Sequence, residues 1–242
     1  MTATLERIAL TAWPALREEH LDGWRLRFAE GYSKRVNAVT PLPPHPAALE
    51  PAIDHCEARY RAAGLRCLFR LVEGLAPEEL DQRLAARGYR LLDPTAVMTL
   101  ALDHPPAATE GVALHDEELA DWLVLYARAT GKPLQGQAVH AAILSRITAR
   151  RRLVSLRLGG EPAGCALAVL DGAYLGLFDL AIVAARRGQG LGARLLAGLL
   201  AWGAGQGARL AYLQVLEDNA AALALYRRLG FRHAYRYWYR SA

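Results

Sequence analysis

The order of apolar and polar residues in the second half of the chain predicts alternating helices and strands. Apolar residues recur with helical spacing over residues 116–130, before Gly131-Lys132-Pro133, and again over residues 138–151. Strand-like runs follow, separated by the hairpin signals Gly159-Gly160 and Asp171-Gly172. We expect strands at residues 153–158, 163–170 and 174–183.

The same pattern continues toward the C-terminus. Residues 191–204 place leucines on one broad helical face, and residues 210–215 form a strand-like run. A helix is expected over residues 219–229, with Gly230 as its C-terminal cap, followed by a strand over residues 233–240.

The first half contains a short echo of this end of the chain. The segment Leu-Ala-Ala-Arg-Gly-Tyr-Arg at 84–90 resembles Tyr-Arg-Arg-Leu-Gly-Phe-Arg at 226–232. A strand-like run precedes each segment, at 66–72 and 210–215, and another follows it. Duplication of one domain type explains this repeat. A chance match is the alternative, because a helix, a glycine and a strand often occur in that order.

A proline-rich segment without periodicity, residues 102–110, separates the two halves and is typical of a linker. The expected domains are therefore 1–104, a linker at 105–110, and 111–242. The chain has 242 residues, of which 53% are hydrophobic and 22% charged, so a sizeable core is expected.

Composition also bounds the compartment and the partners. No apolar run is long enough to span a bilayer, and the first residues lack a signal-peptide pattern, so a cytoplasmic protein is expected. Cys56, Cys67 and Cys165 are scattered and are expected to be buried thiols in a reducing compartment.

The net charge of +5 comes almost entirely from arginine, because lysine occurs only at Lys34 and Lys132. The densest arginine run, residues 146–152, is expected to be a solvated helix face. No nucleic-acid-binding module accompanies the charge, and neither nucleic acid nor membrane is expected as a partner. The seven histidines are isolated in sequence and none forms an H-x-x-x-H pair, so no metal is expected.

The candidate chemistry begins at the turn Arg187-Gly-Gln-Gly-Leu-Gly192, which joins a strand-like run to a helix-like run. Backbone N–H groups of such a turn, together with the helix dipole, attract phosphate. The turn lacks the lysine of a P-loop and does not meet the G-x-G-x-x-G dinucleotide spacing. An ordinary glycine-rich turn, with Arg187 as a solubilising residue, remains the alternative.

With the second motif added, residues 111–240 resemble the GNAT superfamily of acyl-CoA-dependent N-acyltransferases. The phosphate turn of that family reads R/Q-x-x-G-x-G/A, and Arg187, Gly190 and Gly192 fill it. The family's later segment reads N-x-x-A-x-x-L-Y and then G-F. It is matched here by Asn219, Ala222, Leu225, Tyr226, Gly230 and Phe231. The first half resembles the degenerate GNAT-like domains of tandem members.

The resemblance implies an α/β (α+β) fold of two tandem GNAT-like domains. Each would be a mixed, mostly antiparallel sheet flanked by helices. In the C-terminal domain, strand 177–183 would diverge from strand 210–215 in a V-shaped splay. Members usually end in two strands after the G-F, whereas only residues 232–240 remain here. Either this is one long strand, or the first half supplies its neighbour.

The resemblance also implies acetyl-CoA as the co-substrate. Its pantetheine arm would bond to the backbone of Ile182 and Val183. Asn219 would bond the pantetheine or the adjacent helix end. The pyrophosphate would lie on the backbone N–H groups of the turn, which belong to Arg187, Gly188, Gln189, Gly190, Leu191, Gly192 and Ala193.

The implied reaction is direct attack of an amine on the thioester, which agrees with the absence of a nucleophile motif. Tyr226 would be the acid that protonates the leaving thiolate, the alternative being a buried packing role. Asp179 ranks first as the base, although Phe178 stands where diamine acetyltransferases have Glu, which argues against a polyamine acceptor. Glu217 and Asp218 are other candidates, with helix capping as their alternative role.

The expected activity is transfer of an acetyl group to a primary amine of a small molecule or amino acid. A protein or peptide acceptor, or a non-catalytic CoA sensor, are the alternatives. An aromatic and basic cluster on two strand-like runs would suit a carboxylate-bearing acceptor, although ordinary strand residues explain it as well. Its members are Trp24, Arg25, Arg27, Tyr32, Arg35 and Asn37. The protein is expected to be a monomer or homodimer.

Overall fold

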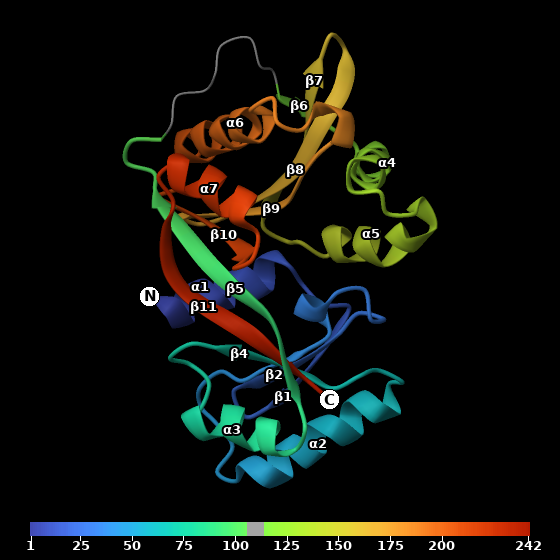
Figure 1. Ribbon diagram of the computed structural model, residues 1–242, viewed down its shortest axis with the longest axis vertical. Coiled ribbons are helices and arrows are strands. Elements are labelled where there is room, and N and C mark those ends of the chain that lie inside the picture. The colour runs from blue at the N-terminus through green and yellow to red at the C-terminus, as the bar shows by residue number, and fades with distance from the viewer. Residues whose placement is uncertain (106–113) are drawn as a thin grey trace. The chain divides into compact units, whose positions relative to one another are not determined.

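A computed structural model describes residues 1–105 and 114–242 as a mixed α/β protein. The contacts between residues divide it into two units, which are described separately (Figure 1). Unit 1 contains Met1–Val97, Leu216–Asp218 and Ala234–Ala242. Unit 2 contains Met98–Val215 and Asn219–His233. The expected linker at 105–110 lies outside the described residues, except for Pro105.

Unit 1 is a sheet packed against helices. Its strands, in sheet order, are β1 (Arg17–Leu21), β2 (Trp24–Phe28), β3 (Val39–Thr40), β4 (Leu68–Val72), β11 (Arg232–Ser241) and β5 (Arg90–Ala101). Its helices are α1 (Thr2–Ala12), α2 (Leu49–Ala62) and α3 (Glu78–Ala86), with a 3₁₀ turn, η1, at Lys34–Val36. Buried side chains such as Trp24, Ile53, Tyr60, Phe69 and Leu80 form its core.

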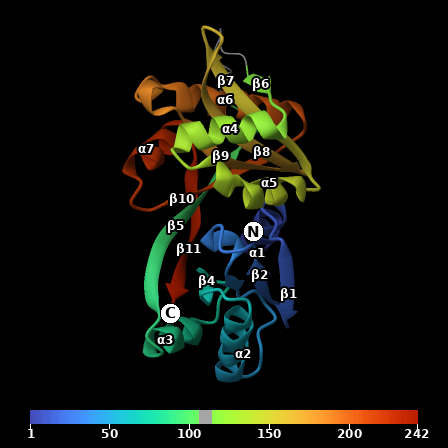
Figure 2. The same cartoon turned by 90° about the vertical axis from the view of Figure 1, so that its right-hand side faces the viewer.

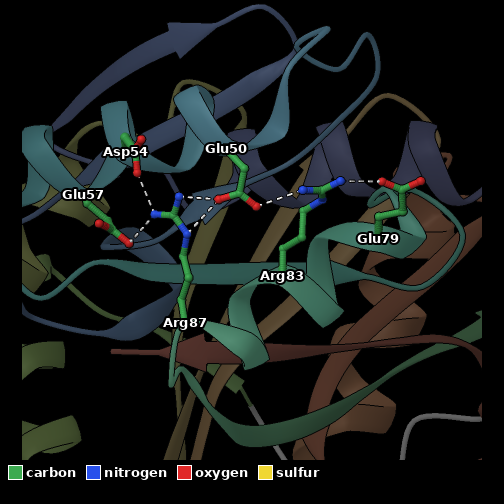
Figure 3. A network of polar contacts seen from close by, with 6 residues as sticks. All are labelled: Glu50, Asp54, Glu57, Glu79, Arg83 and Arg87. Atoms are coloured by element: carbon green, nitrogen blue, oxygen red, sulfur yellow. Dashed lines mark hydrogen bonds and ion pairs between the residues drawn. The ribbon is translucent and has the colours of Figure 1, made fainter.

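Helices α2 and α3 are also joined by ion pairs at their surface (Figure 3). Arg83 of α3 binds Glu50 of α2 at 2.9 Å and Glu79 at 3.1 Å. Arg87 binds Glu50, Asp54 and Glu57, all on α2. Because these side chains are between 25% and 72% exposed, each pair contributes little alone.

The C-terminal strand is one long strand, and most of it belongs to unit 1. β11 pairs antiparallel with β4, from Tyr237 opposite Val72 to Ser241 opposite Leu68. The expected boundaries placed residues 234–242 in the second domain, but these residues belong to unit 1. They do so because β11 lies between β4 and β5 in the sheet and pairs with β4.

Unit 2 is also a mixed sheet with helices on both faces. Its strands, in sheet order after the end of β5, are β10 (Leu210–Leu216), β9 (Tyr174–Ile182), β8 (Glu161–Asp171), β7 (Arg150–Leu158) and β6 (Leu114–Asp116). Helices α4 (Leu119–Thr130) and α5 (Ala138–Ser145) cover one face. Helices α6 (Leu191–Gly205) and α7 (Ala220–Arg228) cover the other (Figures 1 and 2). The 3₁₀ turns η2 and η3 are Leu134–Gln137 and Ala184–Arg186.

The helix expected over residues 138–151 was too long. Helix α5 ends at Ser145, and Arg150 to Arg152 begin β7, where Arg150 lies opposite Leu170 of β8. The pairing of β7 with β8 holds these residues in the sheet. Arg151 donates to the carbonyl of Leu144 at 2.6 Å and so helps to end the helix. The arginine run is therefore not one solvated helix face.

The divergence of two central strands is confirmed. β9 and β10 pair in parallel only from Tyr174 opposite Leu210 to Gly176 opposite Tyr212. β9 then continues to Ile182 and β10 to Leu216 without further pairing between them. The second part of β9 therefore has one edge, toward β10, with no neighbouring strand.

Candidate active site

The glycine-rich turn lies between η3 and α6 and adopts left-handed backbone conformations at two of its glycines. Gly190 precedes the helix with φ +73°, and Gly188 has φ +76°, both in the left-handed region that favours glycine. Arg187 does more than solvate the turn. Its Nε donates to the carbonyl of Ile182 at 3.1 Å, and its Nη2 donates to the carbonyl of Ala129 at 3.3 Å. These bonds tie the turn to β9 and to α4.

The turn presents consecutive backbone N–H groups at the start of α6. Arg187 N–H donates to the carbonyl of Ala184, and Arg194 N–H donates to the carbonyl of Gly190. The N–H groups from Gly188 to Ala193 lie between these two bonds, where a helix cannot supply acceptors of its own. Gly188 to Gly190 are exposed. The turn therefore has the donors and the helix dipole that an anionic ligand requires.

At the end of β9, adjacent backbone groups face opposite sides. Val183 N–H donates to the carbonyl of Ala163 next to β8, and Val183 O accepts from Arg186 N–H. Because the groups of successive residues in a strand alternate in direction, Ile182 N–H points away from β8, toward the edge left by β10. Arg187 already occupies the carbonyl of Ile182. Of these groups, Ile182 N–H is the donor directed to the open edge.

Tyr226 lies on α7, and its side chain is only 9% exposed. Its ring packs edge-on against Phe231, with centroids 6.0 Å apart. Burial raises the pKa of the Tyr226 hydroxyl above its usual value, so the group stays protonated at neutral pH. A protonated hydroxyl is what an acid for a leaving thiolate requires.

Asn219 precedes α7 and caps it. Its Oδ1 accepts a hydrogen bond from Ala222 N–H at 3.1 Å, as an asparagine at a helix N-terminus commonly does. This is one of the two roles expected for Asn219. Glu217 and Asp218, the other acidic residues of this segment, are exposed and belong to unit 1.

Asp179 occupies a β-bulge in β9. Leu167 lies opposite Phe178, and Cys165 lies opposite Ala181, so two residues of β9 face Ala166 alone. Asp179 has φ +51°, which is uncommon for a residue other than glycine. Its side chain is 15% exposed. The bulge fixes the place of a partly buried carboxylate in the part of β9 that has diverged from β10.

No sequence motif points to the group that contacts Asp179. His140 of α5 is fully buried, and its Nε2 lies 2.8 Å from Asp179 Oδ2. The two residues are 39 positions apart in the chain, so a search for acidic residues close in sequence to each histidine does not find the pair. Its position among the apolar residues of α5 is the sequence feature that agrees with the burial of His140.

Part of the cluster expected to bind a carboxylate-bearing acceptor lies in the core of unit 1. Trp24 and Arg27 are fully buried on β2. Arg27 donates to the carbonyls of Leu10, Trp13 and Arg35. Burial lowers the pKa of Arg27 to about 10. Its guanidinium is used inside the protein and is not presented to an acceptor.

Asn37 is likewise occupied, because its side chain bonds the backbone of Ala29, Gly31 and Ser33. The second strand expected in this region is instead the 3₁₀ turn η1 and its flanking loops.

The three cysteines are buried and free, as expected. Burial raises the pKa of the Cys67 and Cys165 thiols to about 12, which leaves them protonated. Within residues 1–105 and 114–242, no cluster of three or more His, Cys, Asp or Glu side chains is arranged to hold a metal ion. In the same ranges no helix is long and apolar enough to cross a membrane.

A sheet that splits beside a glycine-rich helix start defines the GNAT class of N-acetyltransferases, here in tandem form. The chain belongs to the family described as "Probable histone acetyltransferase Rv0428c C-terminal", whose model it matches over residues 2–240.

Relatives in sequence carry acetyltransferase names. "Uncharacterized N-acetyltransferase YobR" of Bacillus subtilis is 26% identical over 98% of this chain and 96% of its own. "Probable histone acetyltransferase Rv0428c" of Mycobacterium tuberculosis is 27% identical over 94% of this chain and 70% of its own. "Mycothiol acetyltransferase" of Clavibacter sepedonicus is 34% identical, over 51% of this chain and 44% of its own.

Solved structures confirm the fold. A "GCN5-related N-acetyltransferase from Kribbella flavida" aligns with a TM-score of 0.76 at 19% identity and covers all of this chain and 95% of that one. A "Tandem GNAT protein from the clavulanic acid biosynthesis pathway" aligns with a TM-score of 0.66 at 18% identity, over 90% of this chain and 78% of that one.

Proposed function

We propose that this protein transfers an acetyl group from acetyl-CoA to the primary amine of a small molecule or amino acid. The observation that carries the proposal is that three groups suited to acetyl transfer occur together near the diverging strands of unit 2. A turn of free backbone donors, a buried protonated tyrosine and a carboxylate held in a bulge all belong to the segment from β9 to α7.

The donor would be bound by backbone groups. The N–H groups from Gly188 to Ala193 would hold the pyrophosphate, whereas Arg187 N–H, which was expected to join them, already donates to the carbonyl of Ala184. Ile182 N–H, at the open edge of β9, would donate to the pantetheine arm, and Val183 would contribute to the shape of that edge. Asn219 would act by fixing the start of α7 and so the position of Tyr226.

The chemistry would need two proton transfers. Asp179 would take one proton from the acceptor ammonium, leaving a neutral amine that attacks the thioester carbonyl. As the carbon–sulfur bond breaks, Tyr226 would protonate the sulfur, and the second nitrogen proton would replace the one that Tyr226 gives up. The products are an N-acetylated acceptor, free CoA and one proton released to solvent.

A small acceptor is favoured by the burial of Asp179. A carboxylate that is 15% exposed, beside a buried histidine that packs on Tyr126 of α4, admits a slender amine more readily than a folded protein surface. The name of the mycobacterial relative supports a protein amine as the second candidate.

The test is release of free CoA thiol from acetyl-CoA in the presence of a panel of amino acids, small amines, amino sugars and lysine peptides. Turnover with a small amine at a kcat/KM above that for every peptide supports the proposal. Faster turnover with peptides favours the second candidate. Tight CoA binding without turnover on any amine contradicts an acetyltransferase and favours a CoA sensor.

A further inference from the structure

Asp179 is the end of a chain of three polar side chains inside unit 2. Asp179 Oδ2 lies 2.8 Å from His140 Nε2, and His140 Nδ1 lies 3.0 Å from Gln137 Oε1. Gln137 Nε2 donates to the carbonyl of Pro133 at 3.3 Å. His140 is fully buried, and Gln137 is 4% exposed. The chain therefore leads from the diverging part of β9 into the protein interior.

The orientation of Gln137 fixes where the protons of His140 lie. Because Gln137 Nε2 donates to a carbonyl, Gln137 Oε1 is the atom that faces the histidine, and it can only accept. His140 Nδ1 must therefore carry a proton. An unprotonated Nε2 would then set its lone pair against an ionised Asp179 oxygen at 2.8 Å. A proton between Nε2 and Oδ2 removes that conflict and forms a charge-assisted hydrogen bond.

Aromatic packing keeps the histidine ring in this orientation. Tyr126 meets the ring edge-on at 4.9 Å between centroids, and Trp122 does so at 5.8 Å. Trp122 is itself anchored, because its Nε1 donates to the carbonyls of Val154 and Ala166 at 3.2 Å. Rotation of the His140 ring would break these contacts. The position of His140 Nε2 opposite Asp179 Oδ2 is therefore held by the fold.

We propose that His140 is a positioning residue for acetyl transfer, which fixes the Asp179 carboxylate and shares the proton that Asp179 removes from the acceptor. This inference rests on the proposed function. A carboxylate alone is a weak base toward an ammonium ion. Without a proton between them, the lone pairs of His140 Nε2 and Asp179 Oδ2 face each other. When the two residues take up the proton of the acceptor ammonium, a hydrogen bond forms between these atoms.

The proton balance is simple. The acceptor ammonium loses one proton, which comes to lie between Asp179 Oδ2 and His140 Nε2, while Nδ1–H remains bonded to Gln137. After the amide has formed, the pair releases this proton to solvent and is ready for another cycle. The other titratable groups nearby are Tyr126, whose hydroxyl accepts from Lys132 Nζ at 3.4 Å, and the buried thiol of Cys165.

The kinetic test compares His140→Gln, Asp179→Asn and His115→Gln, using the best amine from the panel. His140→Gln retains an N–H donor for Asp179 but cannot share a proton. We expect kcat/KM to fall by about 10- to 100-fold, a smaller loss than in Asp179→Asn. We also expect the acid-side decline of kcat/KM to move to lower pH by about 1 unit or more, because a lone carboxylate titrates below an imidazole.

His115→Gln is the matched control, since His115 is an exposed histidine of the same unit, and it should behave as the wild type. An acid-side decline that stays in place in His140→Gln, or activity within about twofold of the wild type, overturns the inference. A purely structural role would lower activity without moving the pH profile.

A second readout does not need turnover. Nitrogen-15 NMR of the histidine rings, with the His140 signals assigned from their loss in His140→Gln, should show a proton on Nδ1 in both the wild type and Asp179→Asn. A neutral Nε2–H tautomer in the wild type overturns the inference. Absence of wild-type turnover with the expected tautomer present contradicts the proposed function instead, so the two failures are distinguishable.

Discussion

Glu6 of α1 and Arg70 of β4 form a two-point ion pair that is entirely buried in unit 1. Arg70 Nη1 and Nη2 lie 2.5 and 3.0 Å from the two oxygens of Glu6. The Tyr235 hydroxyl donates to Glu6 at 2.7 Å, and the Arg70 guanidinium stacks 3.6 Å from the Tyr237 ring centre. The ion pair therefore joins α1 to β4, and two tyrosines of β11 contact its two charges.

Removing one member of this pair should destabilise unit 1 strongly. In Arg70→Met the Glu6 carboxylate remains buried without its partner, which costs about 3–5 kcal/mol of unfolding free energy. Thermal or urea unfolding measures it. Arg83→Met is the control, because its ion pairs with Glu50 and Glu79 are exposed and should contribute less than about 1 kcal/mol.

The double variant Glu6→Leu/Arg70→Met should recover much of the lost stability, because it leaves no unpaired buried charge at the ion pair. A double variant as unstable as the sum of the two single changes would show that the charges themselves are required.

Replacing Tyr226 by phenylalanine should lower kcat by about 100-fold or more while the KM for acetyl-CoA changes little. The ring and its contact with Phe231 are kept, and only the acid is removed. Steady-state kinetics with a saturating acceptor, together with CoA binding by calorimetry, measures both effects. An unchanged kcat would show that Tyr226 is not the acid and only packs against its neighbours.

Replacing Gly190 by alanine should weaken CoA binding by about tenfold. An alanine in the left-handed region costs roughly 1–2 kcal/mol, so the turn must rearrange or carry strain. Gly205→Ala is a matched control at the other end of α6, where an added methyl group meets no atom within 4 Å. Equal dissociation constants for CoA in the two variants would show that the turn is not part of the CoA site.

Acid should destabilise unit 1 partly through Asp81. Hydrogen bonds from Arg240, and then from Trp238, hold the pKa of the Asp81 carboxyl below its usual value. Because the folded-state pKa is the lower one, this stabilisation is fully present above about pH 4 and is lost as the pH falls through the folded-state value.

In Asp81→Asn the midpoint of thermal unfolding should be lower than in the wild type at pH 7, and the difference should shrink below about pH 4. Asp54→Asn, at a carboxylate that is 66% exposed, should show only a small difference at either pH. A gap for Asp81→Asn that stays constant from pH 7 to pH 3 would contradict the assigned cause.

Local signals in the sequence predicted the helices on one face of unit 2 well. The helix expected at 191–204 is α6, and the one expected at 219–229 is α7, with Asn219 and Gly230 at its two ends as predicted. Gly230 has φ +93°, and Phe231 N–H bonds back to the carbonyl of Tyr226. These ends are determined by residues next to one another in the chain.

Features set by distant residues could not be predicted in the same way. No glycine or proline marks the end of α5, and only pairing with β8 shows that Arg150 lies in a strand. The contact of His140 with Asp179 depends on a bulge that places a residue of β9 against α5. Likewise, the basic residue Arg27 could be judged buried only once the carbonyls around it were known.

The place of β11 has a consequence for how the chain matures during synthesis. Most of unit 1 precedes unit 2 in the chain, yet the strand that lies between its β4 and β5 is translated only after α7. A growing chain can therefore complete unit 2's elements while β4 still lacks this neighbour. β11 must therefore emerge from the ribosome before unit 1 can close, so unit 1 is completed after the elements of unit 2 have been made.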